Sequence, residues 1–125
     1  MQFREYFEKQ DHRIVSLAMK ARQQGGICTR SRFGDCNDIV ARTLALLTHN
    51  GIHAKRVAGN FICDPREDVY FEHTWIAISD YVLDPTVDQF FSDLDVDLIT
   101  KQRGIYYSAP DWDGDWLEKR YQFYY

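Results

Sequence analysis

The segment from Cys36 to Asn50 constrains the fold of this 125-residue chain more than any other stretch. Asp35 stands where a helix N-cap belongs, and Gly51 stands where a left-handed C-terminal cap belongs. The apolar residues of the segment fall on more than one side of a helix: Ile39, Val40, Ala41, Leu44, Ala45, Leu46 and Leu47. Since such a helix needs neighbours on several sides, we expect it to be central and buried.

The rest of the chain divides into helices followed by strands. An earlier helix is predicted over 3–24, because apolar residues recur there at helical spacing and Gly25-Gly26 ends the pattern. After Gly51 the apolar period changes to two, which predicts strands over 53–62 (bulged near Gly59), 69–79 and 81–84. Short helices are predicted near 93–101 and 112–120. This order indicates a single α+β domain spanning 1–125, with a small antiparallel sheet.

Charge and hydropathy exclude several classes of protein. Hydrophobic residues make up 45% of the chain, too many for a disordered segment. Residues 1–60 hold ten Lys/Arg and five Asp/Glu (+5), whereas residues 61–125 hold five and fourteen (−9). The acidic half should repel phosphate, so we expect no nucleic-acid partner. Neither a membrane span nor a secretory signal is apparent, so we expect a cytoplasmic protein that does not bind membranes.

The cysteines and acidic residues do not form a metal or disulfide pattern. The three cysteines are an odd number at irregular spacing, which is typical of reduced thiols. Cys63, at a predicted strand end, is interpreted as structural. The four histidines lack ligand spacing, and the Asp111–Asp115 segment lacks the late Glu of a calcium loop, which favours a solvated turn. No metal or cofactor is therefore expected.

Cys36 is the first candidate for chemistry. It lies in the first turn of the buried helix, where unpaired N–H groups and the helix dipole favour a negative charge. A thiolate there has a lowered pKa and is the reactive form of the side chain. The Cys36 N–H also stands where it could donate to an oxyanion, with Gln24 or another group from 23–33 as second donor.

His73 and Asp84 are the partners that such a thiol needs. A two-residue turn at Ser79-Asp80 would pair Trp75 with Asp84 and place the carboxylate on the same sheet face as His73. The two side chains are then diagonal neighbours, with backbones roughly 7–8 Å apart. A carboxylate in that place orients the imidazole and stabilises its charged form.

Four pieces in order resemble a known family. They are Gly34-Asp35-Cys36 with its apolar helix, the strand from Asn50 to Gly59, His73-Thr74-Trp75, and Tyr81 to Thr86. Together they resemble the transglutaminase-like segment of the papain-like cysteine protease superfamily, over about 34–86. Two departures are Thr74 in place of the common Ala and the shifted Lys55-Arg56 pair.

The resemblance implies a papain-like fold and an enzyme that transfers acyl groups from amide bonds of a peptide or protein. Cys36 would be the nucleophile, His73 the general base and then acid, and Asp84 the orienting carboxylate. The reaction could be that of a protease (hydrolase), a glutamine deamidase or a transglutaminase, each through a thioester. The alternative is a papain-like protein-binding module whose catalytic triad is silent. The sequence does not fix the substrate or the oligomeric state.

Two further features have competing interpretations. Gln24-Gly25-Gly26-Ile27-Cys28 is similar to the nucleophile motif of arylamine N-acetyltransferases, but Cys28 does not begin a buried helix. The aromatic tail, in which Trp112 and Trp116 share a helix face, is interpreted as a cover over the sheet, with one wall of a peptide groove as the alternative.

Overall fold

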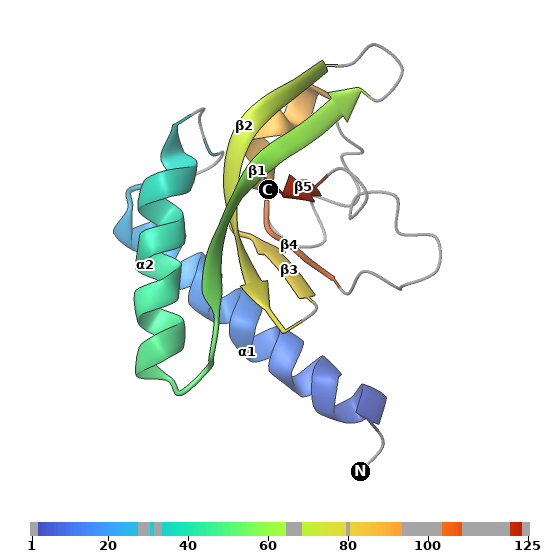
Figure 1. Ribbon diagram of the computed structural model, residues 1–125. Coiled ribbons are helices and arrows are strands. Elements are labelled where there is room, and N and C mark those ends of the chain that lie inside the picture. Colours follow the sequence, from blue (N-terminus) through green and yellow to red (C-terminus); the bar gives the residue numbers. More distant parts are fainter. Residues whose placement is uncertain are drawn as a thin grey trace.

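A computed structural model describes residues 3–27, 31, 34–64, 69–79, 81–93, 104–108 and 121–123. In these residues the chain is α+β, with two helices and a curled five-stranded antiparallel sheet (Figure 1). The elements are α1 (Phe3–Gln24), α2 (Asp35–His49), β1 (Lys55–Asp64), β2 (Val69–Ile78), β3 (Tyr81–Asp84), the 3₁₀ helix η1 (Val87–Asp93), β4 (Tyr106–Ser108) and β5 (Tyr121–Phe123).

The strand order in the sheet is β4-β3-β2-β1-β5, and every pairing is antiparallel. The long strands β1 and β2 form its centre, with Gly59 opposite His73. The β2–β3 hairpin has the predicted register, since Ile78 pairs with Tyr81 and Ile76 with Leu83. The turn between them includes Ser79 with a positive φ of 54°, a conformation that tight hairpin turns require.

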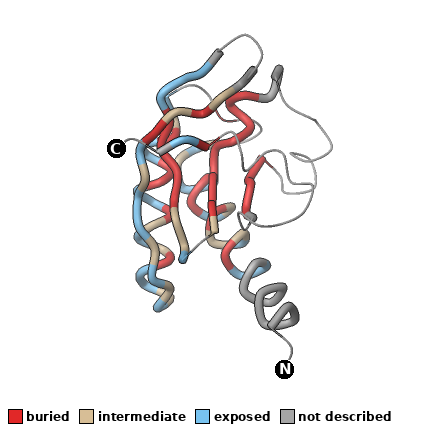
Figure 2. Tube along the Cα trace, turned by 45° about the vertical axis from the view of Figure 1, so that its right-hand side comes forward, coloured by how far each residue is buried: buried red, intermediate tan, exposed pale blue. Residues whose placement is uncertain are grey.

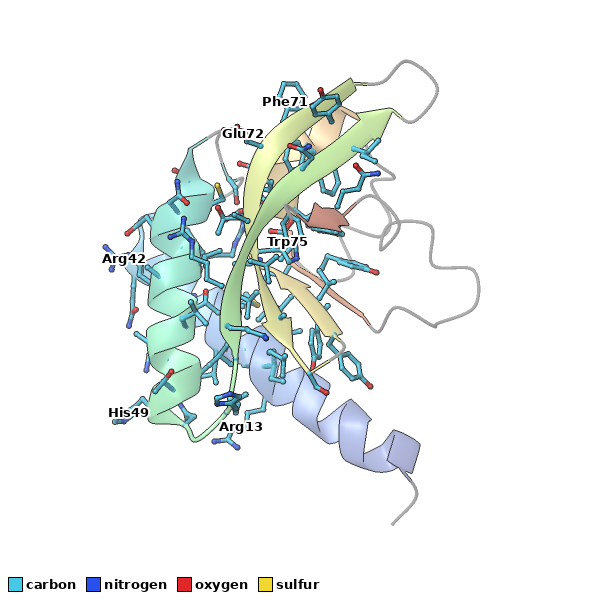
Figure 3. The ribbon with its side chains drawn as sticks, in the orientation of Figure 1. Arg13, Arg42, His49, Phe71, Glu72 and Trp75 are labelled. Carbon is cyan, nitrogen blue, oxygen red and sulfur yellow. The ribbon has the colours of Figure 1, made fainter. Side chains whose placement is uncertain are left out.

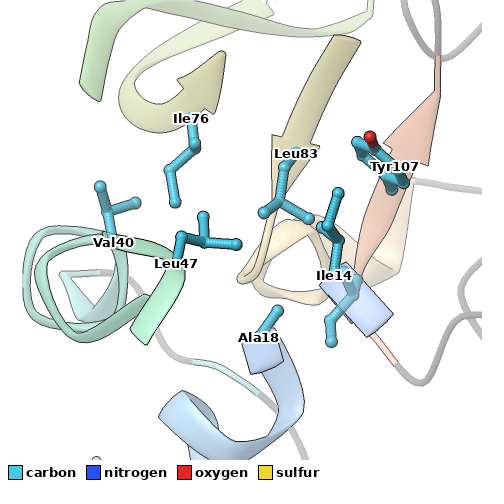
Figure 4. Packing of buried hydrophobic residues seen from close by; sticks show 8 residues of the cluster. Ile14, Ala18, Val40, Leu47, Ile76, Leu83 and Tyr107 are labelled. Carbon is cyan, nitrogen blue, oxygen red and sulfur yellow. The ribbon is translucent and has the colours of Figure 1, made fainter. Parts of the chain in front are cut away.

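One hydrophobic core lies between the helices and the sheet. Ile76 and Leu83 point from β2 and β3 toward the helices, where they meet Val40 and Leu47 of α2 (Figure 4). Ile14 and Ala18 of α1 complete this layer with Ile105 and Tyr107. Helix α2 is buried along one face, which comprises Cys36, Ile39, Val40, Thr43 and Leu47. The prediction of a central helix buried on several sides is wrong, because Ala41 and Ala45 are exposed and Leu44 and Leu46 are only partly buried.

A second core covers the opposite face of the sheet. It consists mainly of aromatic side chains from β1, β2, η1, β4 and β5: Phe61, Trp75, Phe90, Tyr106 and Tyr121, with Val82 and Val87. Phe61 and Phe90 stack with ring centroids 4.1 Å apart, and Tyr106 stacks on Tyr121 at 5.6 Å. Because residues alternate between faces along a strand, His73 and Asp84 belong to this aromatic side.

Both ends of α2 use glycine, although the N-terminal prediction is wrong in one detail. Gly34, with φ of 97°, is the N-cap, and Asp35 is the first helical residue and makes no side-chain cap. The predicted C-terminal cap is confirmed, because Gly51 has φ of 73° and its N–H and that of Ile52 close the helix on Thr48 and Leu47. Cys36 thus keeps its predicted place in the first turn.

The strands differ from the prediction at Gly59 and at the C-terminal end. The bulge lies between Ile62 and Asp64, and Gly59 is regularly paired. Gly59 instead allows the close approach of Gln122 in β5, whose carbonyl oxygen a Cβ would overlap. The strands β4 and β5 and the helix η1 were not predicted. The helices predicted near 93–101 and 112–120 lie almost entirely outside the described residues.

No helix in the described part of the chain is long and apolar enough to cross a membrane.

Candidate active site

The three predicted site residues come together in the structure. The Nε2 atom of His73 lies 2.6 Å from Oδ2 of Asp84, and the Cys36 thiol is hydrogen-bonded to the His73 side chain. All three are buried, with exposed fractions of 8% for Cys36, 3% for His73 and 0% for Asp84. Helix α2 contributes the sulfur, β2 the imidazole and β3 the carboxylate.

The hairpin register places the imidazole beside the carboxylate. Because Ile76 pairs with Leu83, the next residue of β3, Asp84, lies opposite Trp75 of β2. Trp75 and His73 are two residues apart on β2 and share a face, so Asp84 reaches the ring diagonally. The rings of Phe90 and Phe61 stand edge-on to the imidazole at centroid distances of 5.0 and 5.9 Å, which limits its orientation.

The residue after the thiol fixes the first turn of α2 against the sheet. The Asn37 Oδ1 atom accepts hydrogen bonds from Arg56 Nη2 at 2.8 Å and from Thr74 Oγ1 at 3.1 Å. Arg56 lies in β1 and Thr74 in β2, so one amide oxygen binds two strands to the helix. The Thr74 backbone is also hydrogen-bonded to Cys36. The sulfur is therefore held at the strand that carries His73.

The surroundings of Cys36 favour its thiolate. Burial is the largest influence and raises the pKa, and the negative charge of Asp84 acts in the same direction. The hydrogen bond and positive charge of His73, with the hydrogen bond from Thr74, have the opposite effect and outweigh them. The pKa of Cys36 is therefore lower than that of an ordinary cysteine, which makes the thiol more reactive at neutral pH.

The surroundings of His73 favour its protonated form. Burial lowers its pKa and is the largest single influence, but the charge and hydrogen bond of Asp84, followed by those of Cys36, exceed it. Together they raise the pKa of His73 from 6.5 to about 9. A raised imidazole pKa and a lowered thiol pKa are the signature of a thiolate–imidazolium pair.

The Asp84 carboxylate is fully satisfied by protein groups. Oδ2 accepts from the Tyr121 hydroxyl at 2.8 Å as well as from His73, and Oδ1 accepts from the Thr86 backbone N–H at 3.0 Å. Each of these groups donates to the carboxylate, and in the Asp84–His73 hydrogen bond the donor is the Nε2–H of the imidazole.

Gln89 occupies the other ring nitrogen of His73. Its Nε2 atom lies 2.7 Å from Nδ1 of the imidazole. Gln89 belongs to a continuous buried run from residue 82 to 90 (Figure 2). The polar members of the run are Asp84, Thr86, Asp88 and Gln89. The preceding residue, Asp88, forms a buried bidentate ion pair with Arg22 of α1. The distances are 3.0 Å from Nη1 to Oδ1 and 2.8 Å from Nη2 to Oδ2. Segment 84–89 thus holds both nitrogens of one imidazole.

Sequence reasoning found the three central residues but missed four that support them. Asn37, Gln89 and Tyr121 act through contacts between residues far apart in the sequence, which no local pattern encodes. Thr86 binds Asp84, two residues before it. Gln89 and Thr86 do follow Asp84 closely, and a polar residue in an otherwise apolar buried stretch is the signal that marks them.

The other candidates are placed only in part. Gln24 is exposed at the end of α1, although the next residue, Gly25, packs against Ile39 and Asp38 of α2. Cys63 lies in β1, but its side chain is outside the described residues, as is all of Cys28. Asp111–Asp115, Trp112 and Trp116 are also outside them. Among described side chains, no group of three His, Cys, Asp or Glu residues gathers to hold a metal ion.

Comparisons with protein-family models, with curated proteins and with solved structures gave no significant match.

Proposed function

We propose that this protein is a papain-like, transglutaminase-like cysteine enzyme that transfers an acyl group from an amide of a peptide or protein. The observation that carries the proposal is the His73 imidazole, which is hydrogen-bonded to the Cys36 thiol and to the Asp84 carboxylate. Both pKa shifts have the direction that a nucleophilic thiol requires. The position of Cys36 in the first turn of α2 is a second, independent factor that stabilises its thiolate.

The first half of the proposed reaction forms a thioester. With the proton of the Cys36 thiol already on His73, the thiolate attacks the carbonyl carbon of the amide. The tetrahedral oxyanion accepts a hydrogen bond from the Cys36 backbone N–H in the first turn of α2. The imidazolium then protonates the leaving nitrogen, and the C–N bond breaks. An amine or ammonia departs, and the acyl group remains on sulfur.

The second half releases the acyl group. Neutral His73 takes a proton from water or from an acceptor amine as that molecule attacks the thioester carbonyl. The C–S bond then breaks, and the sulfur leaves as the thiolate beside the imidazolium, which restores the starting pair. Water as acceptor gives hydrolysis or deamidation, and an amine gives a new amide. The choice between them depends on which acceptor reaches the thioester.

The alternative is a papain-like binding module with a silent triad. The observation that favours it is the 8% exposure of Cys36, because an amide substrate has to reach the sulfur. A silent module needs no reactive thiolate, so its Cys36 would react with electrophiles slowly or not at all.

Acylation by p-nitrophenyl acetate tests the proposal. The expected result is a burst of p-nitrophenol that equals the protein concentration, with acetyl recovered by mass spectrometry on the Cys36 peptide. The Cys36→Ala chain should give no burst, and Cys63→Ser should keep it as the matched thiol-loss control. Absence of a burst in the intact protein, or acetylation of Cys28 in its place, would contradict the enzyme and favour the silent module.

A further inference from the structure

Gln89 lies against the one ring atom that the proposed reaction uses for proton transfer. Asp84 holds Nε2 of His73, and the proton of that nitrogen stays in the bond. A proton exchanged with Cys36 therefore has to pass through Nδ1. Gln89 Nε2 lies 2.7 Å from that atom, and the His73 side chain is also hydrogen-bonded to Cys36.

We infer that Gln89 is a positioning residue that keeps the His73 ring in place in both of its protonation states. The amide N–H donates to Nδ1 while the imidazole is neutral. After Nδ1 has taken the proton of the Cys36 thiol, the amide turns about its last torsion and its oxygen accepts from Nδ1–H. The inference deepens the proposed function and rests on it for the direction of proton transfer.

The chemistry of an amide suits this position. Glutamine carries an acceptor and two donors at the end of one side chain, and exchanging them needs no change in the position of the group. A glutamate in this place would only accept, and would hold the proton on Nδ1. A methionine of similar length would neither donate nor accept, and the ring would lose its partner on this side.

The backbone around Gln89 is held independently of His73. Its own N–H donates to the Thr86 carbonyl at 3.1 Å. The preceding Asp88 accepts from Arg22 and from the Ser31 backbone N–H at 3.1 Å. A Cβ on Gly104 would overlap the Asp88 carboxylate, so the glycine allows this close packing. The amide is thus presented to Nδ1 from a segment that is held by contacts other than those to His73.

The charged and titratable groups around His73 leave a role for a neutral residue. Asp84 faces the ring from β3, and the Cys36 thiol meets it from α2. Tyr121 of β5 donates its hydroxyl to Asp84. Arg22 and Asp88 neutralise each other beside Gln89. The charges that favour imidazolium are thus already present, and an uncharged amide does not add another.

Nitrogen NMR of the His73 side chain tests the inference without any substrate. Long-range proton–nitrogen spectra report the protonation of Nδ1 and Nε2 separately across a pH titration. In the intact protein, Nε2 should stay protonated while Nδ1 titrates. In Gln89→Glu the Nδ1 midpoint should rise by about one pH unit or more, because the carboxylate only accepts. In Gln89→Met the midpoint should stay close to that of the intact protein.

The rate of Cys36 alkylation gives the second readout. Gln89→Met should slow iodoacetamide labelling of the Cys36 peptide at pH 7 by roughly tenfold, since the ring is no longer held in line. Gln23→Glu, an exposed change of the same chemistry on α1, is the matched control and should alter neither readout. Circular dichroism verifies folding, and if Gln89→Met does not fold, the midpoint in Gln89→Glu decides alone.

Two results would overturn the inference. One is a Gln89→Glu midpoint equal to that of the intact protein. The other is a folded Gln89→Met chain that labels at the unchanged rate. A merely structural glutamine predicts the unchanged labelling rate in Gln89→Met, with lower thermal stability as the only effect. A shifted Nδ1 midpoint in Gln89→Glu without a burst of p-nitrophenol would support the role of Gln89 and contradict the proposed enzyme. Failure of the inference can therefore be told apart from failure of the proposed function.

Discussion

His73 and Asp84 meet as diagonal neighbours across β2 and β3, with Nε2 and Oδ2 2.6 Å apart and both side chains fully buried. Because the surrounding residues are largely aromatic, loss of either group would remove the main partner of the other from a buried place. The pair therefore carries stability as well as reactivity.

Replacing the Asp84 carboxylate should lower both the stability of the fold and the pKa of His73. Asp84→Asn leaves a buried imidazole without its ion-pair partner, which we expect to cost about 3 kcal/mol of unfolding free energy. The pKa of His73 should fall, because Asp84 is the main group that raises it. Urea denaturation measures the first effect and NMR titration the second. The exposed Asp38→Asn change breaks an ion pair with Arg42 and should cost less than about 1 kcal/mol.

Removing the imidazole should shift the pH at which Cys36 reacts. In His73→Gln, burial still raises the thiol pKa, but the His73 hydrogen bond and charge that lower it are lost. Labelling by iodoacetamide at pH 6–7 should therefore fall at least roughly tenfold and recover only at alkaline pH. Peptide mapping measures it, with the exposed His53→Gln as control. An unchanged profile in His73→Gln would show that the imidazole does not activate the sulfur.

The buried Arg22–Asp88 ion pair between α1 and η1 should contribute far more to the free energy of unfolding than the exposed pair of Arg42 with Asp38. Arg22→Met leaves the Asp88 carboxylate buried without its cation, and we expect a loss of about 3 kcal/mol. Arg42→Met removes a solvent-exposed partner that projects from α2 away from the sheet (Figure 3), and should change stability by less than about 1 kcal/mol. Equal losses in urea denaturation would contradict the assignment of Arg22 as an anchor of segment 84–89.

Gly59 should be intolerant of any side chain. A Cβ there would overlap the Gln122 carbonyl oxygen and the Trp75 ring, so Gly59→Ala should displace β5. We expect a loss of about 1–3 kcal/mol in thermal or urea unfolding. Tyr121 should move with the strand and weaken its hydrogen bond to Asp84. Ala58→Ser, an exposed change at the preceding position, should leave stability nearly unchanged.

Local patterns in the sequence were sufficient where local physics sets the structure. The extent of α1, the place of Cys36 in the first turn of α2 and the register of the β2–β3 hairpin follow from periodicity, end signals and turn length. The diagonal contact of His73 and Asp84 then follows from the parity of side chains along paired strands.

Long-range packing decided the features that the sequence did not indicate. The strands β4 and β5 have three residues each, which is too short for an alternating pattern to be recognised. They form because β4 pairs with β3 and β5 pairs with β1 at the two edges of the sheet. Gly34 rather than Asp35 caps α2, since either residue type satisfies the cap rule. The contact between Gln89 and His73 depends on how η1 folds back, which the Arg22–Asp88 pair controls from another element.

The two-residue connection between Ile78 and Tyr81 has a consequence for protein engineering. One extra amino acid inserted there would transfer Asp84 to the helix-facing side of the sheet and bring Leu83 or Pro85 under the imidazole, whereas two extra amino acids would restore the alternation. Loop libraries built at this hairpin should therefore retain thiol reactivity only when the number of added residues is even.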